Sequence, residues 1–200
     1  MKICLSELAI SQINGLNGTG LELLARETSV YIKLGIPGDL FPLTMERCLF
    51  MSGSDNSVVT FMWNLGVRAP EVMSSLTIIL PNSAISTLIG HGGCTIKFLQ
   101  EQSGARMSVE DRVDTVKERI LRISSIIPEI VYKCLRLVLD KISTDSQVGQ
   151  NNNVSYNTHI PSVATGTVFA TGVSMGITSR KRLIPMSSQK KLRLITHASG

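Results

Sequence analysis

The stretch LIGHGGCTIKFLQEQSGARMSV, residues 88–109, places three glycines within four positions, directly before a pattern typical of a helix. These are Gly90, Gly92 and Gly93, with His91 between them. Glycine loses more conformational entropy on folding than other residues, so a chain uses it where the backbone turns tightly or approaches another group closely. The stretch therefore predicts a tight loop whose backbone a ligand can approach.

Around this loop the periodicity predicts six elements in the order strand, helix, helix, strand, strand, helix. They cover about 76–80, 82–89, 95–102, 105–109, 117–124 and 128–142. Ser103-Gly104 is a typical helix end, and Pro128 suits the first turn of the last helix. The order predicts an α+β fold in which a three-stranded antiparallel sheet packs on three helices.

The same pattern occurs earlier in the chain, because residues 6–34 match residues 81–109 at an offset of 75. Six identities carry the match: Ala9, Ile10, Ser11, Gly15, Gly18 and Leu24 pair with Ala84, Ile85, Ser86, Gly90, Gly93 and Leu99. The first copy predicts the same six elements from Met1 to about Leu65. Trp63 and the neighbouring stripe of Val58, Val59 and Met62 are predicted to lie in its core.

These patterns predict two domains, 1–69 and 75–144, joined by a linker at 70–74. Residues 145–200 are rich in Ser, Thr, Asn and Gly without sustained period, and are predicted to be a disordered tail. Residues 1–143 hold 14 basic and 14 acidic residues, whereas 144–200 hold six basic residues and one acid. Bulk electrostatic attraction is therefore not expected to be the main binding device of the folded part.

The four cysteines are far apart and the chain has only three histidines, so neither a metal site nor a cofactor is predicted. No paired acid and base, nucleophile or metal cluster suggests an enzyme. No apolar run approaches the 18 residues of a membrane span, and no signal-length apolar segment opens the chain. A nuclear or cytoplasmic protein with reduced cysteines is expected.

The glycine loop joins two helices, and the second helix begins with free backbone N–H groups that suit an anion. Two other known types of glycine-rich loop do not fit this sequence. A dinucleotide fingerprint requires a third glycine where Thr95 stands, and a phosphate-binding Walker loop requires a G-K-[ST] ending. A mere turn between helices remains an alternative reading of the loop.

The stretch LIGHGGCTIKFLQEQSGARMSV closely resembles the core of type I KH (K-homology) domains, whose usual form is IGKGGxxIKxIxxxTGAxI. ERCLFMSG in the first copy is similar to the strand that follows the variable loop in Nova-type and poly(C)-binding KH proteins. The resemblance covers about 1–143 and implies two tandem KH domains, the first of them degenerate. In this family the GxxG loop clamps about four single-stranded nucleotides, and an adjacent groove reads their bases.

The resemblance implies which residues bind RNA in the second copy. Gly90, His91, Gly92 and Gly93 would form the clamp; Ile85, Leu88, Ile89, Lys97, Arg106, Met107 and Arg119 would line or edge the groove. His91 replaces the usual loop lysine and attracts phosphate less, although its imidazole still donates a hydrogen bond. The loop of the first copy, Gly15, Leu16, Asn17 and Gly18, has no basic residue, and Glu22 stands where Lys97 does.

Two hypotheses follow. The first is a non-catalytic binder of single-stranded RNA acting in splicing, stability or translation of messages through its second domain; the sequence does not separate RNA from single-stranded DNA. The second is a protein-interaction module in which KH units pair through their outer strand and last helix. Base preference, targets and oligomeric state stay open, as does whether the C-terminal residues are a genuine tail.

Overall fold

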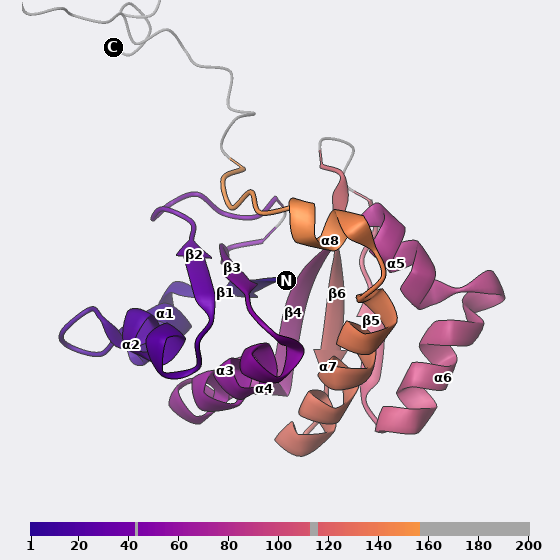
Figure 1. The fold of residues 1–200 in the computed structure, drawn as a ribbon, viewed down its shortest axis with the longest axis horizontal. Coiled ribbons are helices and arrows are strands. Elements are labelled where there is room, and N and C mark those ends of the chain that lie inside the picture. The colour runs from indigo at the N-terminus through magenta and orange to yellow at the C-terminus, as the bar shows by residue number, and fades with distance from the viewer. Residues whose placement is uncertain (43, 113–115, 157–200) are drawn as a thin grey trace, which may run out of the picture. The chain divides into compact units, whose positions relative to one another are not determined.

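A computed structural model describes residues 1–42, 44–112 and 116–156 of the chain. All of the described residues belong to one compact unit. Figure 1 shows a central sheet with helices packed along it. No helix among the described residues is both long enough and apolar enough to cross a membrane.

The first half of the unit contains three strands and three helices in the order strand, helix, helix, strand, strand, helix. They are β1 (Lys2–Leu5), α1 (Glu7–Asn14), α2 (Gly20–Glu27), β2 (Tyr31–Leu34), β3 (Arg47–Ser52) and α3 (Asp55–Arg68). Serine side chains cap two of these helices: Ser6 accepts a hydrogen bond from the Ala9 amide, and Ser54 accepts one from the Ser57 amide.

The second half repeats this order. Its elements are β4 (Ser75–Pro81), α5 (Asn82–Ile89), α6 (Cys94–Ser103), β5 (Arg106–Val109), β6 (Glu118–Ser124) and α7 (Pro128–Ile142). A single 3₁₀ turn, η1 (His91–Gly93), stands between α5 and α6. Gly104 ends α6 in a left-handed conformation, and its amide donates to the Gln100 carbonyl at 2.8 Å.

The six strands form one antiparallel sheet in the order β2-β3-β1-β4-β6-β5. The prediction of two separate three-stranded sheets is therefore corrected: β1 pairs with β4, with Lys2 opposite Ile79 and Ile3 opposite Ile78. Unpaired edge strands present free N–H and C=O groups, and pairing β1 with β4 satisfies part of both sets. The mixed fold of sheet and helices is as predicted.

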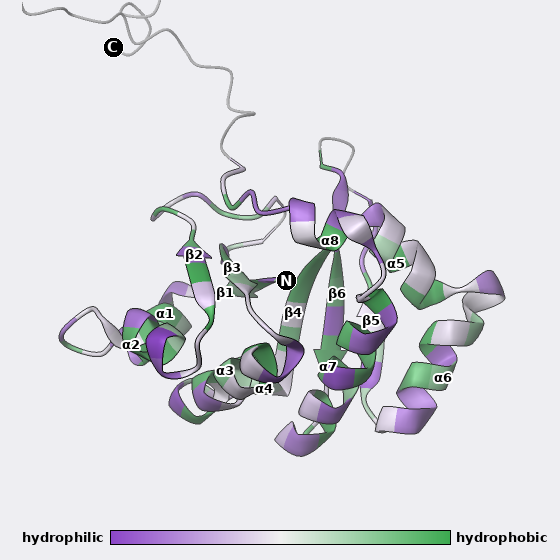
Figure 2. Ribbon diagram, in the orientation of Figure 1, coloured by the Kyte–Doolittle hydropathy of each residue, from purple (hydrophilic) through white to green (hydrophobic). Residues whose placement is uncertain are grey.

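Successive residues of a strand point to opposite faces of the sheet, and both faces are covered here. Toward the helices, residues such as Ile3, Leu49, Ile78 and Leu121 join the main core. On the other face Cys4, Cys48, Phe50, Ile79 and Ile120 form a second cluster with Phe41 and Val154. In Figure 2 strand β4 is largely hydrophobic, whereas α6 and α7 carry both hydrophobic and hydrophilic residues.

Two predictions about the connecting segments differ from the structure. The proposed linker 70–74 is a short helix, α4 (Pro70–Ser74), in which Val72 and Met73 are buried. The predicted disordered tail starts too early: α8 (Ser146–Gln150) and residues 151–156 are ordered against the sheet. The remainder of that prediction, 157–200, lies outside the described residues.

The predicted core of the first half is confirmed with one exception. Val58, Val59 and Met62 are buried, whereas Trp63 is 44% exposed on the outer side of α3. The stripe of apolar residues is wider than the face that the sheet and neighbouring helices cover.

Candidate nucleic-acid interface

The glycine loop lies between the end of α5 and the start of α6. Its glycines all have positive φ: +70° at Gly90, +58° at Gly92 and +79° at Gly93. Residues with a Cβ rarely adopt this region, so the local fold needs glycine at these positions. His91 is the one loop residue with a side chain, and it is exposed to solvent.

The glycines serve two different purposes. A Cβ on Gly90 would collide with the side chain of Thr95, so this position has no room for a side chain. A Cβ on Gly92 or Gly93 would meet no atom within 4 Å. The crown of the loop therefore faces open space, and the absence of side chains leaves its backbone accessible to another molecule.

Helix α6 begins directly after the crown and has no side-chain cap. Gly93 occupies its N-cap position, where a residue without a side chain cannot satisfy the first backbone amides. The helix dipole adds partial positive charge at the same place. The end of the loop is thus suited to an anionic group such as a phosphodiester.

Three of the predicted apolar groove residues are buried. Ile85 and Leu88 have no exposed surface, and Met107 is 6% exposed. The prediction that Ile85 and Leu88 line the groove surface is corrected, because the structure places both in the main core. Ile89 is half-buried at the end of α5 and is the apolar side chain of this set with accessible surface beside the loop.

The predicted cationic residues differ in how far they are exposed and in whether they are already hydrogen-bonded. Lys97 on α6 and Arg106 on β5 are exposed. Arg119 on β6 is half-buried, and its Nε donates to the Glu110 carbonyl at 2.9 Å. Helix α6 is tied to β5 because the Met107 amide donates to the Gln100 side chain at 2.9 Å.

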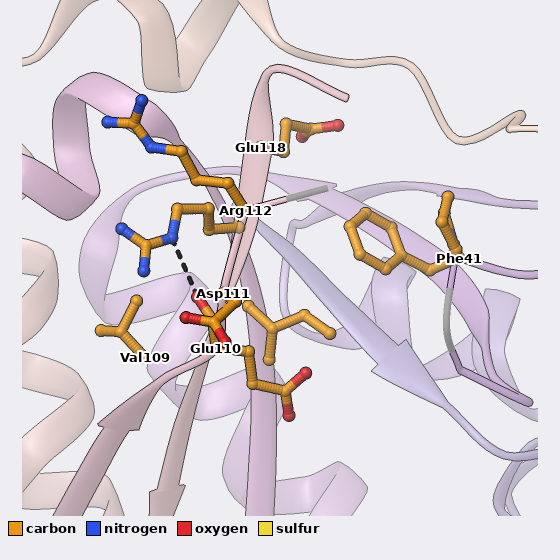
Figure 3. A pocket seen from close by; sticks show the side chains of 9 residues that line it. Phe41, Val109, Glu110, Asp111, Arg112 and Glu118 are labelled. Carbon is orange, nitrogen blue, oxygen red and sulfur yellow. Dashed lines mark hydrogen bonds between the residues drawn. The ribbon is translucent and has the colours of Figure 1, made fainter. Parts of the chain in front are cut away.

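Arg119 also lines a cavity of about 390 Å³ beyond the ends of β5 and β6 (Figure 3). Its walls come from both halves of the unit: Phe41, Pro42, Val109, Glu110, Asp111, Arg112, Glu118, Arg119 and Ile120. Carboxylates and guanidinium groups stand together there, so the cavity offers both acceptors and donors of hydrogen bonds. The sequence analysis missed this cavity, since Phe41 and Glu110 are 69 positions apart and no local pattern joins them.

Two of the charged groups on this side of the sheet are already engaged. Arg122 on β6 donates from Nε to Glu110 Oε1 at 3.1 Å and from Nη1 to Thr77 Oγ1 at 3.1 Å. Burial raises the pKa of the neighbouring Glu46, an effect that Arg122 opposes and Glu110 reinforces. Because Arg122 and Glu110 pair with each other, their charges are less available to a ligand.

The equivalent loop of the first half has a different conformation. Gly15 and Gly18 have positive φ, as Gly90 and Gly93 do, but Asn17, which stands where Gly92 does, has not. Leu16 is fully exposed at the crown, and Glu22 on α2 is exposed where Lys97 stands in the second half. An apolar crown beside a carboxylate is a poor phosphate site.

The described residues contain no group of three or more histidine, cysteine or acidic side chains able to hold a metal ion.

Comparison with known proteins bears on the second half in particular. The family model of the KH domain matches residues 75–140. The human RNA-binding protein Nova-2 is 29% identical over 181 residues, covering 78% of this chain and 37% of Nova-2. The RNA-binding protein Pasilla of Drosophila melanogaster is 27% identical over 176 residues, covering 78% of this chain and 22% of Pasilla. The chain thus spans well under half the length of either relative.

Solved structures give a weaker likeness. Dim2p from Pyrococcus horikoshii OT3 has a TM-score of 0.23 and 15% identity, covering 72% of this chain and 98% of Dim2p. In the complex of a/eIF2alpha, aDim2p and rRNA from the same organism, the matched chain has a TM-score of 0.24 and 16% identity; the match covers 72% of this chain and 91% of that chain. TM-scores this low do not establish a shared fold, so the comparison of this chain with known proteins rests on sequence. By sequence, residues 75–140 match the family model of the KH domain, and the chain is similar to two RNA-binding proteins.

Proposed function

We propose that this chain binds single-stranded RNA through the loop Gly90–Gly93 and the surface beside it. The observation that carries the proposal is the open crown of the loop, where Gly92 and Gly93 face empty space at an uncapped helix N-terminus. A sugar-phosphate backbone can approach such a crown closely, and backbone amides can contact its phosphates.

The accessible side chains around the loop complete the proposed site. His91 donates to a phosphate, and Lys97 and Arg106 supply positive charge along the strand's path. Ile89 offers an apolar contact to an unstacked base, with Ile85, Leu88 and Met107 supporting it from below. Arg119 and the cavity beyond it read the edge of a further base, since the cavity holds both donors and acceptors.

The test replaces the crown with acids. The variant H91D/G92D places two carboxylates where the proposal puts the phosphates, so we expect at least a tenfold loss of affinity for short single-stranded RNAs on a randomised array. The matched control is L16D/N17D, which introduces the same two acids into the loop of the first half and is expected to keep RNA binding. If folded H91D/G92D binds as tightly as the parent chain, the loop assignment is wrong.

The same array distinguishes the remaining alternatives. Parallel arms of single-stranded DNA separate RNA from DNA, because only RNA has the 2′-hydroxyl. We propose that residues 1–69 are a second, degenerate KH unit that contributes little to RNA affinity, and that the protein acts on messenger RNA in the nucleus or cytoplasm. A folded chain that binds no nucleic acid favours the second hypothesis, a protein-interaction module, for which the exposed Leu16 is the supporting observation.

A further inference from the structure

Two cysteines stand opposite each other in the interior of the sheet. In the register of β1 with β3, Cys4 is the direct partner of Cys48. Residues paired in this way carry their side chains on the same face of a sheet, and both cysteines belong to the cluster on the face opposite the helices. Their exposed fractions are 4% and 0%. The two thiols therefore face each other in a buried place outside the proposed RNA site.

The hydrogen bonds between the strands show which kind of pair this is. Met1 and Met51 donate to each other's carbonyls at 2.9 and 2.8 Å. Such pairs alternate along an antiparallel ladder with pairs that exchange no hydrogen bond, so Cys4 and Cys48 form a pair of the second kind. The Cys48 carbonyl instead accepts from the Gly35 amide at 2.8 Å. The Cα atoms of a pair without hydrogen bonds lie about 4.5 Å apart, closer than those of a hydrogen-bonded pair.

This spacing suits a disulfide. The Cα atoms that a disulfide joins usually lie about 4.4–6.8 Å apart, so the strands need not separate for the sulfurs to bond. A hydrogen bond to the Cys48 side chain raises the pKa of the Cys4 thiol and burial raises it further, which keeps Cys4 in its less reactive form. The spacing is at the short end of the range, and a strained disulfide is easily reduced. The pair is therefore suited to reversible oxidation.

The segment 151–156 covers this pair. Val154 and Tyr156 pack on the cluster that contains both cysteines, and the segment itself is neither helix nor strand. The Tyr156 amide donates to Asp39 Oδ1 at 2.8 Å, and the Tyr156 hydroxyl donates to Glu118 Oε2 at 2.8 Å. A segment without secondary structure opens at a lower free energy than the core strands of a sheet. Its opening admits a small reagent to the thiols while the strands stay paired.

We propose that Cys4 and Cys48 are an oxidation site, at which hydrogen peroxide forms a reversible disulfide between β1 and β3 when the segment 151–156 opens. One sulfur attacks a peroxide oxygen, the O–O bond breaks, and a sulfenic acid and a water molecule form. The other sulfur then attacks the sulfenic sulfur, the S–S bond forms, the S–O bond breaks, and a second water molecule leaves with the remaining thiol proton. Each sulfur loses one electron, and the peroxide is reduced to water.

The experiment treats the folded full chain with hydrogen peroxide, blocks the remaining thiols with N-ethylmaleimide and maps the digested peptides by mass spectrometry without reduction. We expect a peptide pair linked through Cys4 and Cys48 that dithiothreitol separates. The buried Cys134 is the internal control and is expected to stay a thiol. The variant C94S is expected to give the same linked pair, which excludes a route through the exposed Cys94. No RNA is present, so the result does not depend on the proposed function.

Variants of the covering segment test the role of its opening. Tyr156→Ala removes both the ring and the hydroxyl, so we expect disulfide formation at least about tenfold faster, because access to the thiols follows the opening free energy of their cover. Tyr156→Phe keeps the ring and is expected to accelerate the reaction less. The matched control is Trp63→Ala, which removes an aromatic ring from α3, on the helical face of the sheet, and is expected to leave the rate unchanged.

Thermal unfolding before oxidation shows which of these variants are folded. The proposal is overturned if the folded parent chain yields no linked pair, if the pair forms only after unfolding in urea, or if the folded Tyr156 variants form it no faster than the parent chain.

Discussion

At the scale of single residues, the two glycine loops show how one sequence pattern supports different surfaces. Gly15 and Gly90 stand at equivalent positions and have nearly the same backbone, with φ and ψ of 59° and −167° against 70° and −179°. This region is essentially restricted to glycine. Only Gly90 is also enclosed, because Thr95 fills the space that a Cβ would need, whereas Gly15 has nothing within 4 Å.

The comparison of Gly90→Ala with Gly15→Ala isolates that difference. Both variants meet backbone strain of about 1–3 kcal/mol, which cancels between them. Gly90→Ala adds a collision with Thr95, and overpacking of this kind costs about 1–3 kcal/mol. We expect Gly90→Ala to lower the free energy of unfolding by at least about 1 kcal/mol more than Gly15→Ala in urea titrations. Equal losses would mean that Thr95 moves aside without cost.

The glycine loop could be predicted from residue type alone, because few residues other than glycine adopt positive φ. It did not predict which apolar residues are accessible. Ile85 and Leu88 follow helical spacing, and spacing shows the face of a helix but not how deeply that face is covered. The burial of both residues depends on β4, β6 and α7, which pack on α5 from elsewhere in the chain.

At the scale of elements, the strands and the longer helices follow their periodicity, whereas the two shortest α-helices do not. Helices α4 and α8 have five residues each, which is too short for a helical period to be visible. Residues 151–156, with the sequence NNNVSY, have the composition of disorder. Their order depends on partners in the sheet, since Lys2 Nζ donates to Asn151 Oδ1 and to the Asn153 carbonyl.

The packing of α7 on α3 makes a prediction about alkaline pH. Burial raises the pKa of Tyr132 to about 12 from 10, and the nearby Glu129 adds to the shift. The folded state therefore holds the Tyr132 proton more tightly than the unfolded state, and this stabilisation is complete below pH 10 and lost as the pH rises toward 12. We expect the melting temperature of the parent chain to fall more steeply between pH 10 and pH 12 than that of Tyr132→Phe.

Measurements of both proteins at pH 8 supply the reference for that comparison. There Tyr132→Phe loses its hydrogen bonds to the Met62 and Trp63 carbonyls, at a cost of about 1 kcal/mol. If the melting temperatures of the two proteins fell by the same amount between pH 10 and pH 12, Tyr132 would titrate in the folded chain as it does in the unfolded chain.

At the scale of the whole molecule, one buried cluster joins the two halves. Lys2 on β1 forms an ion pair with Glu118 on β6, and both side chains are at least 95% buried. The Tyr156 hydroxyl donates to Glu118 Oε2 at 2.8 Å. Burial raises the pKa of Tyr156, and Cys48 and Glu118 raise it further, so the hydroxyl stays protonated and remains a donor. Local periodicity cannot predict such a cluster, because Lys2, Glu118 and Tyr156 are far apart in the sequence.

Removing the charge of Glu118 tests how much this cluster contributes. Glu118→Gln keeps the shape but leaves Lys2 without its counter-charge in the interior, and breaking a buried pair in this way costs about 3–5 kcal/mol. The matched control is Glu27→Gln, because Glu27 pairs with Arg68 at 3.9 Å on the exposed surface. We expect the control to change the free energy of unfolding by less than about 1 kcal/mol. Equal effects of the two variants in chemical denaturation would contradict the interpretation.

The last prediction concerns the segment 151–156, which covers the face of the sheet opposite the helices. Val154 and Tyr156 pack over Cys4 and Cys48, which are buried, whereas Cys94 is exposed. A chain ending at Tyr156 keeps this cover, and a chain ending at Gln150 loses it together with three hydrogen-bond partners of Lys2. We expect only Cys94 to react rapidly with a thiol reagent in the first chain, and Cys4 and Cys48 to react as well in the second. The shorter chain is also expected to be less stable, because the Lys2–Glu118 pair meets solvent on one side. If both chains show one fast thiol and the same stability, the segment only lies on the sheet, and β1 and β4 hold the halves together without it.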